Sequence, residues 1–446
     1  MKRIKQVSVV TVAFFIGASL AGCDGNTQGA APGGTRDNGK NVMNVVKINA
    51  KDLQTPVYGQ WDSAAVTAAA GENDFAFRLS AALAEKAGDG NFVCSPYSVW
   101  LPLAVLVNAT DEEHKAAVLE GLGASGITGE DLNRAASRML YDLTKLRNKE
   151  DGEYYYNPLK IANAIFVGNT VTLKKDFAQA FADYYRGAAI NVDFSSRDAV
   201  DAVNQWASES TDGLITDLVR EFDPQTVAAI ANAIYFSDRW AWEFRPEQTK
   251  EGVFHAAAGD SAACYMLREG DAQTYYEDDR VQAMPLQFKT GGGMYIILPK
   301  TGGAKELLSS MTNDYFSEIQ SDSIHATGKL LLPRFSIEND VQNLKETLEE
   351  LGIPLFDRES APLSGGLIEE SVPVWLSDAI QKAVVQVDEK GTTAAAVTVI
   401  PAPGAGMPQP TEPFQMICDK PFVFILYEHT HDGGSQVLFT GIVNRP

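Results

Sequence analysis

The sequence predicts an α+β protein with large antiparallel sheets. Helical periodicity dominates the first half of the 446-residue chain, and strand patterns dominate the second half. Neighbouring strand segments follow one another too closely for helical crossovers, which favours antiparallel pairing. No change of composition divides the chain after about residue 72, so we expect one large domain over 72–446.

The helices are predicted from apolar residues that recur at helical spacing. In the first, at 73–87, Asn73 can cap the helix and Phe75, Leu79 and Leu83 share one face. The other predicted helices are 96–107, 112–121, 129–147, 174–185, 197–210 and 341–351. Alternating or continuous apolar runs predict strands at 160–167, 228–236, 281–288, 293–299, 328–337, 383–387, 421–427 and 436–443.

The N-terminus is typical of an export signal. Lys2, Arg3 and Lys5 precede an apolar run over 7–20. That run is too short to span a bilayer comfortably as a permanent helix. We therefore expect an exported protein, and we expect residues 1–22 to be removed as a signal peptide.

A lipid attachment site is predicted where this run ends. Leu20-Ala21-Gly22-Cys23 resembles a bacterial lipobox, in which cleavage precedes the cysteine and Cys23 is lipidated. Several acyl chains on one cysteine anchor a protein stably, so we expect a lipoprotein at the membrane or cell surface. The alternative is an ordinary secretory signal with a chance cysteine. Residues 23–60 are expected to hold the lipidated cysteine and a flexible tether.

Charge and cysteine content exclude several classes of function. The formal net charge is −21, and removal of 1–22 takes away three cations and no anion, which gives −24. So acidic a surface disfavours contact with nucleic acid or anionic lipid. Cys94, Cys264 and Cys418 are too few and too widely spaced for a disulfide framework or metal site, so we expect buried thiols.

The sequence offers little for catalysis. It has no Gly-x-Ser-x-Gly elbow, no phosphate-binding loop and no GxGxxG segment. His429-Thr430-His431 lacks a third ligand and is expected in a hairpin turn before Gly433-Gly434. We expect no metal, no cofactor and no enzymatic activity.

A segment near the C-terminus has the composition of a loop that can become a strand. It follows the predicted strand 383–387 and begins at Glu389-Lys390-Gly391, where glycine permits a change of backbone direction. No charged residue lies between Gly391 and Gln409, so burial there would leave no unpaired ion. One face from residue 392 is small except at its end: Thr392, Ala394, Ala396, Thr398 and Ile400. The alternative is an Ala/Thr-rich surface linker.

Five further motifs occur in an order that resembles one known family. They are Asn91-Phe92-Val93-Cys94-Ser95-Pro96-Tyr97-Ser98; Asn204-Gln205-Trp206 with Thr211-Asp212-Gly213-Leu214-Ile215; Asn232-Ala233-Ile234-Tyr235-Phe236 with Trp240 and Phe244; Leu332-Pro333-Arg334-Phe335; and Asp419-Lys420-Pro421-Phe422 with Leu438-Phe439-Thr440-Gly441. Together with the segment at 389–400 they resemble the serpins, inhibitors of serine proteases, over 72–446. The resemblance implies the serpin fold, with a large antiparallel or mixed main sheet, smaller sheets, about eight or nine helices and an exposed reactive-centre loop.

The resemblance also implies roles for individual residues. Ser98, Asn232 and Gln381 would form a polar "shutter" under the centre of the main sheet, where Gln381 stands in place of the family's histidine. Trp240 would lie in the "breach", where the loop enters the sheet. The hinge of the loop would comprise Glu389, Gly391, Thr392, Ala394, Ala395 and Ala396. Ordinary packing is the alternative for each polar residue and for Trp240.

The bond attacked by a target protease is placed by the family's spacing. Counting from Glu389 gives Ala405 before the bond and Gly406 after it, and small Ala405 would suit proteases with elastase-like pockets. Val399, Ile400 and Met407 are alternatives if the register slips. Prolines crowd this part of the loop, at 401, 403, 408, 410 and 413. Pro401 and Pro403 also lack the N–H that an inserted strand would use.

The sequence therefore predicts a monomeric inhibitor that forms a covalent complex with a serine protease. The loop would insert into the main sheet after cleavage and carry the protease with it. Three alternatives stay open: an inhibitor of a cysteine protease, a non-inhibitory serpin-fold binding protein, and a solute-binding or hydrolytic lipoprotein.

Overall fold

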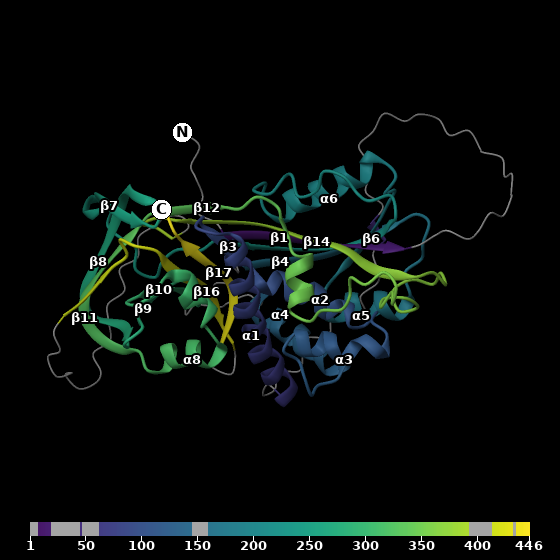
Figure 1. The fold of residues 1–446 in the computed structure, drawn as a ribbon, viewed down its shortest axis with the longest axis horizontal. Helices are drawn as coiled ribbons and strands as arrows, with labels where there is room; N and C mark the ends of the chain where they lie inside the picture. The colour runs from purple at the N-terminus through teal and green to yellow at the C-terminus, as the bar shows by residue number, and fades with distance from the viewer. Residues whose placement is uncertain (1–7, 19–44, 47–61, 145–158, 392–412, 431–433) are drawn as a thin grey trace, which may run out of the picture.

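A computed structural model describes residues 8–18, 45–46, 62–144, 159–391, 413–430 and 434–446. Its main sheet lies in the centre and right of Figure 1. The strand order is β12-β14-β1-β6-β4-β5-β2, and only β4 and β5 are parallel. These strands are β12 (Phe335–Glu338), β14 (Val374–Val387), β1 (Ser8–Ala18), β6 (Thr226–Phe236), β4 (Leu159–Gly168), β5 (Ala188–Val192) and β2 (Val45–Val46), with β13 (Gln342–Asn343) beside β14.

The second sheet holds the C-terminal strands. Its order is β15-β11-β8-β9-β10-β16-β17-β3, with β7 beside β8, and the long β8 joins what would otherwise be two smaller sheets. The strands are β15 (Phe414–Ile417), β11 (Ile324–Pro333), β8 (Gly259–Glu277), β9 (Val281–Gln287), β10 (Gly293–Pro299), β16 (Phe422–His429), β17 (Ser435–Val443), β3 (Phe92–Cys94) and β7 (Lys250–Ala256).

Helices cover both faces of the main sheet (Figure 1). The described part of the chain contains nine α-helices: α1 (Ser63–Lys86), α2 (Pro96–Leu106), α3 (Glu112–Gly121), α4 (Gly129–Thr144), α5 (Lys175–Tyr185), α6 (Arg197–Ser210), α7 (Ala304–Ser309), α8 (Asn313–Ser321) and α9 (Lys345–Glu350). A short 3-10 helix, η1 (Pro246–Gln248), follows β6. None of the described helices combines the length and apolarity needed to cross a membrane.

Two apolar cores lie on the two faces of the sheet. The larger contains α2, whose residues are all buried and, except for Ser98, mostly apolar. The smaller lies under α6, which is alone on the opposite face in Figure 1 and buries Ala199, Val200, Val203 and Ala207. The predicted α+β class and the main elements are therefore confirmed.

Several predicted boundaries were wrong. The first helix begins at Ser63, where Asp62 caps it by accepting a hydrogen bond from the Ala65 N–H, so Asn73 lies inside the helix and caps nothing. The predicted strand 328–337 is divided at Arg334 into β11 and β12. The predicted strand 383–387 is only the end of β14. Elements without a sequence prediction are β1, β2, β3, β5, β7, β8, β13, β15, α7 and α8.

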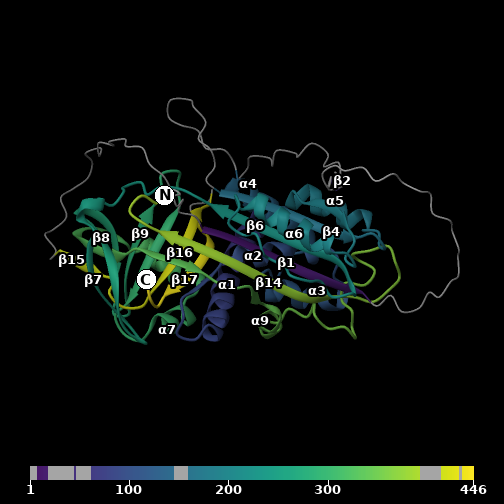
Figure 2. The ribbon, with the colours of Figure 1, turned by 90° about the horizontal axis from the view of Figure 1, so that it is seen from above.

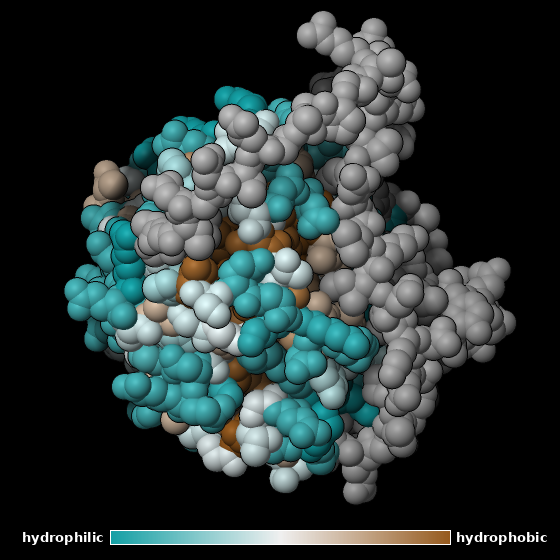
Figure 3. All heavy atoms as spheres, turned by 90° about the vertical axis from the view of Figure 1, so that its right-hand side faces the viewer, coloured by the Kyte–Doolittle hydropathy of each residue, from teal (hydrophilic) through white to brown (hydrophobic). Residues whose placement is uncertain are grey.

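The surface is mostly polar at the end of the molecule shown in Figure 3, where hydrophobic residues show only between hydrophilic ones. The thiols of Cys94 and Cys418 are buried as expected, and burial raises the pKa of the Cys94 thiol to about 11. The expectation was wrong for Cys264, which is exposed because it lies between the buried Ala263 and Tyr265 in β8 and alternation along a strand puts it on the opposite face.

Candidate functional site

The hinge of the loop is attached to the body by one buried carboxylate. Glu389 lies just after β14 and is only 4% exposed. Arg334 forms an ion pair with it, with its Nε 2.9 Å from both carboxylate oxygens, and the Thr249 hydroxyl donates a hydrogen bond of 2.5 Å. Burial alone would raise the pKa of Glu389, but the hydrogen bonds from Arg334 and Thr249 outweigh it and lower that pKa. The hinge is thus held by a charged clamp.

We expect this clamp to make stability depend on pH. Because the pKa of Glu389 is lowered on folding from its ordinary 4.5, its contribution is present above pH 4.5 and is lost as the pH falls through the folded value. Glu389→Gln should lower the free energy of unfolding by about 1–2 kcal/mol at pH 7. The loss is smaller than for a fully buried ion pair because Arg334 is half-exposed.

Chemical unfolding at pH 3 to 8 measures this effect. The difference between the parent and Glu389→Gln should shrink at the acid end of the range. Glu346→Gln, which removes an exposed partner of Lys86, is the matched control and should change little at any pH. A constant difference from pH 3 to 8 would contradict a role for the Glu389 charge.

Gly391 needs to be glycine. Its φ is +72°, and a Cβ there would lie 2.3 Å from the main-chain nitrogen of Trp240. It forms an antiparallel bridge with Arg239, just beyond the end of β6. The expected change of backbone direction is therefore seen at this residue, and it fixes the start of the loop beside β6.

Trp240 closes the same corner of the molecule. Its indole N–H donates to the Asp388 carbonyl at 2.9 Å, its main-chain N–H donates to the Lys390 carbonyl at 3.2 Å, and its ring stacks on Phe288 with 4.8 Å between centroids. Trp240 is 1% exposed. The tryptophan predicted for the breach thus contacts the hinge directly, at the end of β14 where any inserting strand would begin.

The strand position between β6 and β14 is filled by β1. Figure 2 shows β1 in purple beside β14. Both of its pairings are antiparallel, and Ser8 lies opposite Val385 of β14 and Phe236 of β6, at the end nearest the hinge. We call this the β1 position. Residues 8–18, predicted as part of a signal peptide, therefore form an interior strand of the main sheet.

The predicted shutter residues fall into two hydrogen-bonded groups. Gln381 accepts from the Ser95 N–H at 3.3 Å and donates to the Ser95 carbonyl at 3.0 Å. The Ser95 hydroxyl lies within hydrogen-bond distance of the Ser98 hydroxyl, at 3.1 Å, and donates to the Leu438 carbonyl at 2.7 Å. Ser95 joins the two predicted residues, and sequence reasoning missed it.

Asn232 belongs to a separate group. Its amide donates to Asn163 Oδ1 at 2.8 Å, and Asn163 in turn donates to the Tyr185 carbonyl. Asn232 is fully buried, and its Oδ1 has no hydrogen-bond partner within the described part of the chain. A buried acceptor without a donor costs about 1–3 kcal/mol. The interior of the main sheet therefore contains a buried hydrogen-bond acceptor, Asn232 Oδ1, that is unpaired among the described residues.

The remaining predicted site residues lie outside the described residues. These are Cys23, Thr392, Ala394, Ala395, Ala396, Ala405 and Gly406. Arg334 and Asn163, which the structure adds, gave no signal of their partners in the sequence because the partners are far away along the chain. β16 and β17 form an antiparallel hairpin, but His429 lies in β16 opposite Ser435 and not in the turn, and His431 lies outside the described residues.

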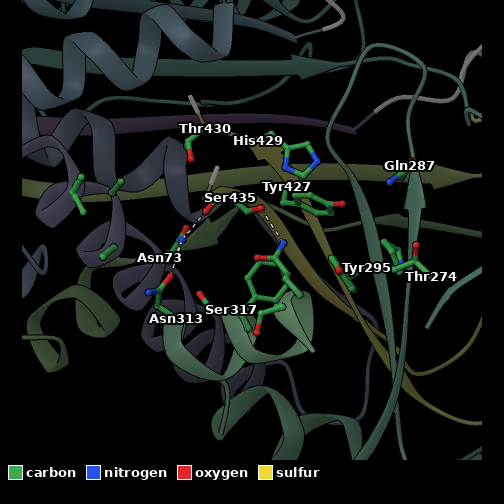
Figure 4. A pocket seen from close by; sticks show the side chains of 18 residues that line it. Asn73, Thr274, Gln287, Tyr295, Asn313, Ser317, Tyr427, His429, Thr430 and Ser435 are labelled. Carbon is green, nitrogen blue, oxygen red and sulfur yellow. Dashed lines mark hydrogen bonds between the residues drawn. The ribbon is translucent and has the colours of Figure 1, made fainter. Parts of the chain in front are cut away.

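A cavity of about 500 Å³ lies away from the hinge, between α1, α8 and the second sheet (Figure 4). Tyr295 and Tyr427 line it with ring centroids 5.3 Å apart. Asn73 donates to Asn313 and to the Ser435 carbonyl, as the dashed lines in Figure 4 show. The polar groups on this side are thus already paired with one another, so apolar and aromatic contacts would have to dominate any binding.

Comparison with known proteins covers most of the chain. Residues 70–446 match the family model described as Serpin (serine protease inhibitor). Alpha-1-antitrypsin 1-2 of Mus musculus is 30% identical over 405 residues, which cover 89% of this chain and 94% of that protein. Alpha-1-antiproteinase of Rattus norvegicus is 30% identical over 360 residues, with 80% and 84% covered.

Solved structures give the same picture of the fold. The native state of the thermophilic serpin tengpin superposes with a TM-score of 0.72 at 25% identity, covering 87% of this chain and 96% of that one. Thyroxine-binding globulin in complex with thyroxine gives a TM-score of 0.70 at 23% identity, covering 85% and 99%. The predicted architecture of a large mixed sheet, further sheets and nine helices in the described residues is confirmed.

Proposed function

Because the chain belongs to the serpin family of protease inhibitors, we propose that it traps serine proteases by inserting its cleaved loop into the main sheet at the β1 position. One observation carries the proposal: Gly391 pairs with Arg239 in a register that a strand in the β1 position could continue. Gly391 lies opposite Arg239, three residues beyond Phe236 of β6. Continued without a shift, this register brings Ala394 opposite Phe236, where Ser8 of β1 lies.

The register on β14 agrees with the register on β6. Ala394 in the place of Ser8 would pair with Val385, which leaves Glu389 and Lys390 as a two-residue turn between β14 and the new strand. Along β6, the same register runs from Ala394 opposite Phe236 to Gly404 opposite Thr226. The loop up to the proposed reactive bond, Ala405–Gly406, is therefore as long as the strand it would pair with.

The polar chemistry of the loop also fits. In this register Thr398 would come opposite both Asn232 and Gln381, which are the partners of Val12 in β1. Directly opposed residues of an antiparallel pair share a face of the sheet. The Thr398 hydroxyl would then be the donor that the unpaired Oδ1 of Asn232 lacks. Small Ala396 would come opposite Ile234 and Ala383, which are both buried.

Incubation of residues 24–446 with elastase-like serine proteases tests the proposal. We expect a covalent complex that survives SDS, with cleavage between Ala405 and Gly406 identified by mass spectrometry of the released C-terminal fragment. A parallel incubation with a papain-like cysteine protease tests the alternative target class. Complete cleavage of the loop without any complex, for every protease tried, would reject inhibition.

Thr398→Val should weaken trapping. The inserted strand would leave Asn232 Oδ1 buried without a donor, which costs about 1–2 kcal/mol, and slower insertion lets more protease escape. The number of inhibitor molecules consumed per trapped protease should rise severalfold. Thr398→Ser should restore the parent value. Thr393→Val, on the other face of the loop, is the matched control, and an equal loss there would contradict the pairing with Asn232.

We also propose that the protein is exported and carries lipid on Cys23. The basic residues, the apolar run and the lipobox-like ending support this. Growth with a labelled fatty acid should label the wild-type protein and leave Cys23→Ala unlabelled. Label on Cys23→Ala, or an unprocessed wild-type chain, would reject lipidation.

The cavity between α1 and α8 favours a second candidate function, the binding of a small aromatic ligand. The paired rings of Tyr295 and Tyr427 provide the contact surface. Thyroxine, which the similar globulin binds, is the probe. A rise in the unfolding temperature with thyroxine that is lost in Ser317→Trp, which fills the cavity, would support this function. No rise would reject it for this probe class.

A further inference from the structure

The N-terminal segment occupies the strand position that the proposed mechanism requires to be empty. β1 pairs with β14 over Ser8–Ala18 and with β6 over Ser8–Gly17, without a shift in either pairing from Ser8 to Phe15. A central strand with neighbours on both sides satisfies its own main-chain groups and theirs. The slot between β6 and β14 is therefore closed along almost its whole length.

Side-chain packing holds β1 as well as main-chain pairing does. Ala13 is fully buried and Phe15 is 8% exposed, both in the core under α6. The Phe15 ring meets Phe222 edge-on, with 5.3 Å between centroids and 86° between planes. The Ser377 hydroxyl donates to the Phe15 carbonyl at 3.1 Å. These contacts resemble those of a native core strand.

We propose that this segment is autoinhibitory. A chain that retains residues 8–18 folds with β1 in the strand position that the cleaved loop would occupy, and it cannot trap a protease. The proposal rests on the proposed function. Any occupant of the β1 position excludes the loop, since one slot accepts one strand. Loss of the segment, as expected when residues 1–22 are removed, would open the slot and activate the trap.

At one position β1 leaves a polar group of its neighbouring strand without a hydrogen bond, and this favours its replacement by the loop. The residue opposite Asn232 and Gln381 is Val12, which has no hydroxyl, and Asn232 Oδ1 stays unpaired. The loop would bring Thr398 to the same place. At this one position the loop is the better match, although the N-terminal segment is present from the start of synthesis.

The test uses the full chain, with Cys23→Ala to prevent processing. In this background Val12→Pro removes a main-chain donor from the middle of β1, and proline is not tolerated within a central strand. We expect the parent to form at least about tenfold less SDS-stable complex with an elastase-like protease than the Val12→Pro variant does. Thr27→Pro, outside β1, is the matched control and should behave like the parent. Detectable trapping of equal extent by the parent and Val12→Pro would overturn the proposal.

A second readout separates this proposal from the proposed function. Hydrogen exchange on the same proteins should show protected main-chain amides in β6 and β14 in the parent and faster exchange there in Val12→Pro. If no form traps a protease but this difference is seen, the proposed function fails and β1 occupancy stands. If the exchange of β6 and β14 is the same in both, β1 does not occupy the slot and the proposal fails, whether or not trapping occurs.

A third experiment adds the N-terminal segment as a separate peptide. A synthetic peptide of residues 8–18 incubated with residues 24–446 should raise the unfolding temperature and abolish trapping in proportion to the fraction bound. A peptide of the same composition in scrambled order is the control. Trapping that persists when the peptide is shown by mass spectrometry to be bound would contradict competition for one slot.

Discussion

Ala396→Arg should convert residues 24–446 from an inhibitor into a substrate. In the register set at the hinge, residue 396 comes opposite Ile234 and Ala383, which are 0% and 1% exposed. No described acidic side chain lies at either partner position, so an inserted arginine would bury a charge without a counter-ion, at a cost of several kcal/mol. Insertion should then be slower than deacylation by at least about tenfold.

The measurement is the ratio of trapped to cleaved inhibitor at a fixed amount of protease. Gln409→Arg is the matched control, because residue 409 follows the proposed reactive bond and stays behind when the cleaved loop inserts. It should trap like the parent. Position 392 is a poorer choice for this experiment, because the same register places it opposite Asp238, a buried carboxylate that could pair with arginine. Unchanged trapping by Ala396→Arg would contradict insertion at the β1 position.

Cleavage of the loop in residues 24–446 should raise thermal stability by about 20 °C. Insertion of residues 394–404 beside β6 and β14 adds on the order of ten main-chain hydrogen bonds, each worth about 1 kcal/mol net. In a domain of this size 1 kcal/mol shifts the midpoint by about 2 °C. Calorimetry before and after limited proteolysis measures the shift.

The full chain gives the contrasting result. With β1 in place, cleavage of the same loop should leave the unfolding temperature within a few degrees of its starting value, because the slot is already filled. Val12→Pro in the full chain should restore most of the rise. A rise of equal size in the full chain and in residues 24–446 would show that β1 does not block the loop. No rise in either would show that the loop does not insert.

The sequence predicted those features that local pattern controls. The glycine at 391, the end of β14 and the helix α2 each follow from a few neighbouring residues. Arg334 could not be paired with Glu389, because the two are brought together only when β11, β12 and β14 assemble. The split of the shutter residues was also hidden, since Ser95 and Asn163 mediate it from separate elements.

The largest difference between the sequence prediction and the structure concerns residues 8–18. An apolar run after three cations satisfies the pattern of an export signal, and the same β-branched and aromatic residues satisfy the pattern of a buried central strand. Composition cannot distinguish the two, because a membrane and a protein core both reward apolar side chains. Only the pairing with β6 and β14 assigns the segment to the sheet.

This double fit makes the order of events during synthesis decisive. A segment buried under α6, with Ala13 fully enclosed, cannot be presented to an export apparatus or to a signal peptidase. Folding and export would then compete for the same eleven residues of β1. Chains that fold before export would stay inside the cell with β1 in the sheet, and they would not inhibit the cell's own proteases. Chains that are exported before they fold would lose residues 1–22 and would become active inhibitors only after crossing the membrane.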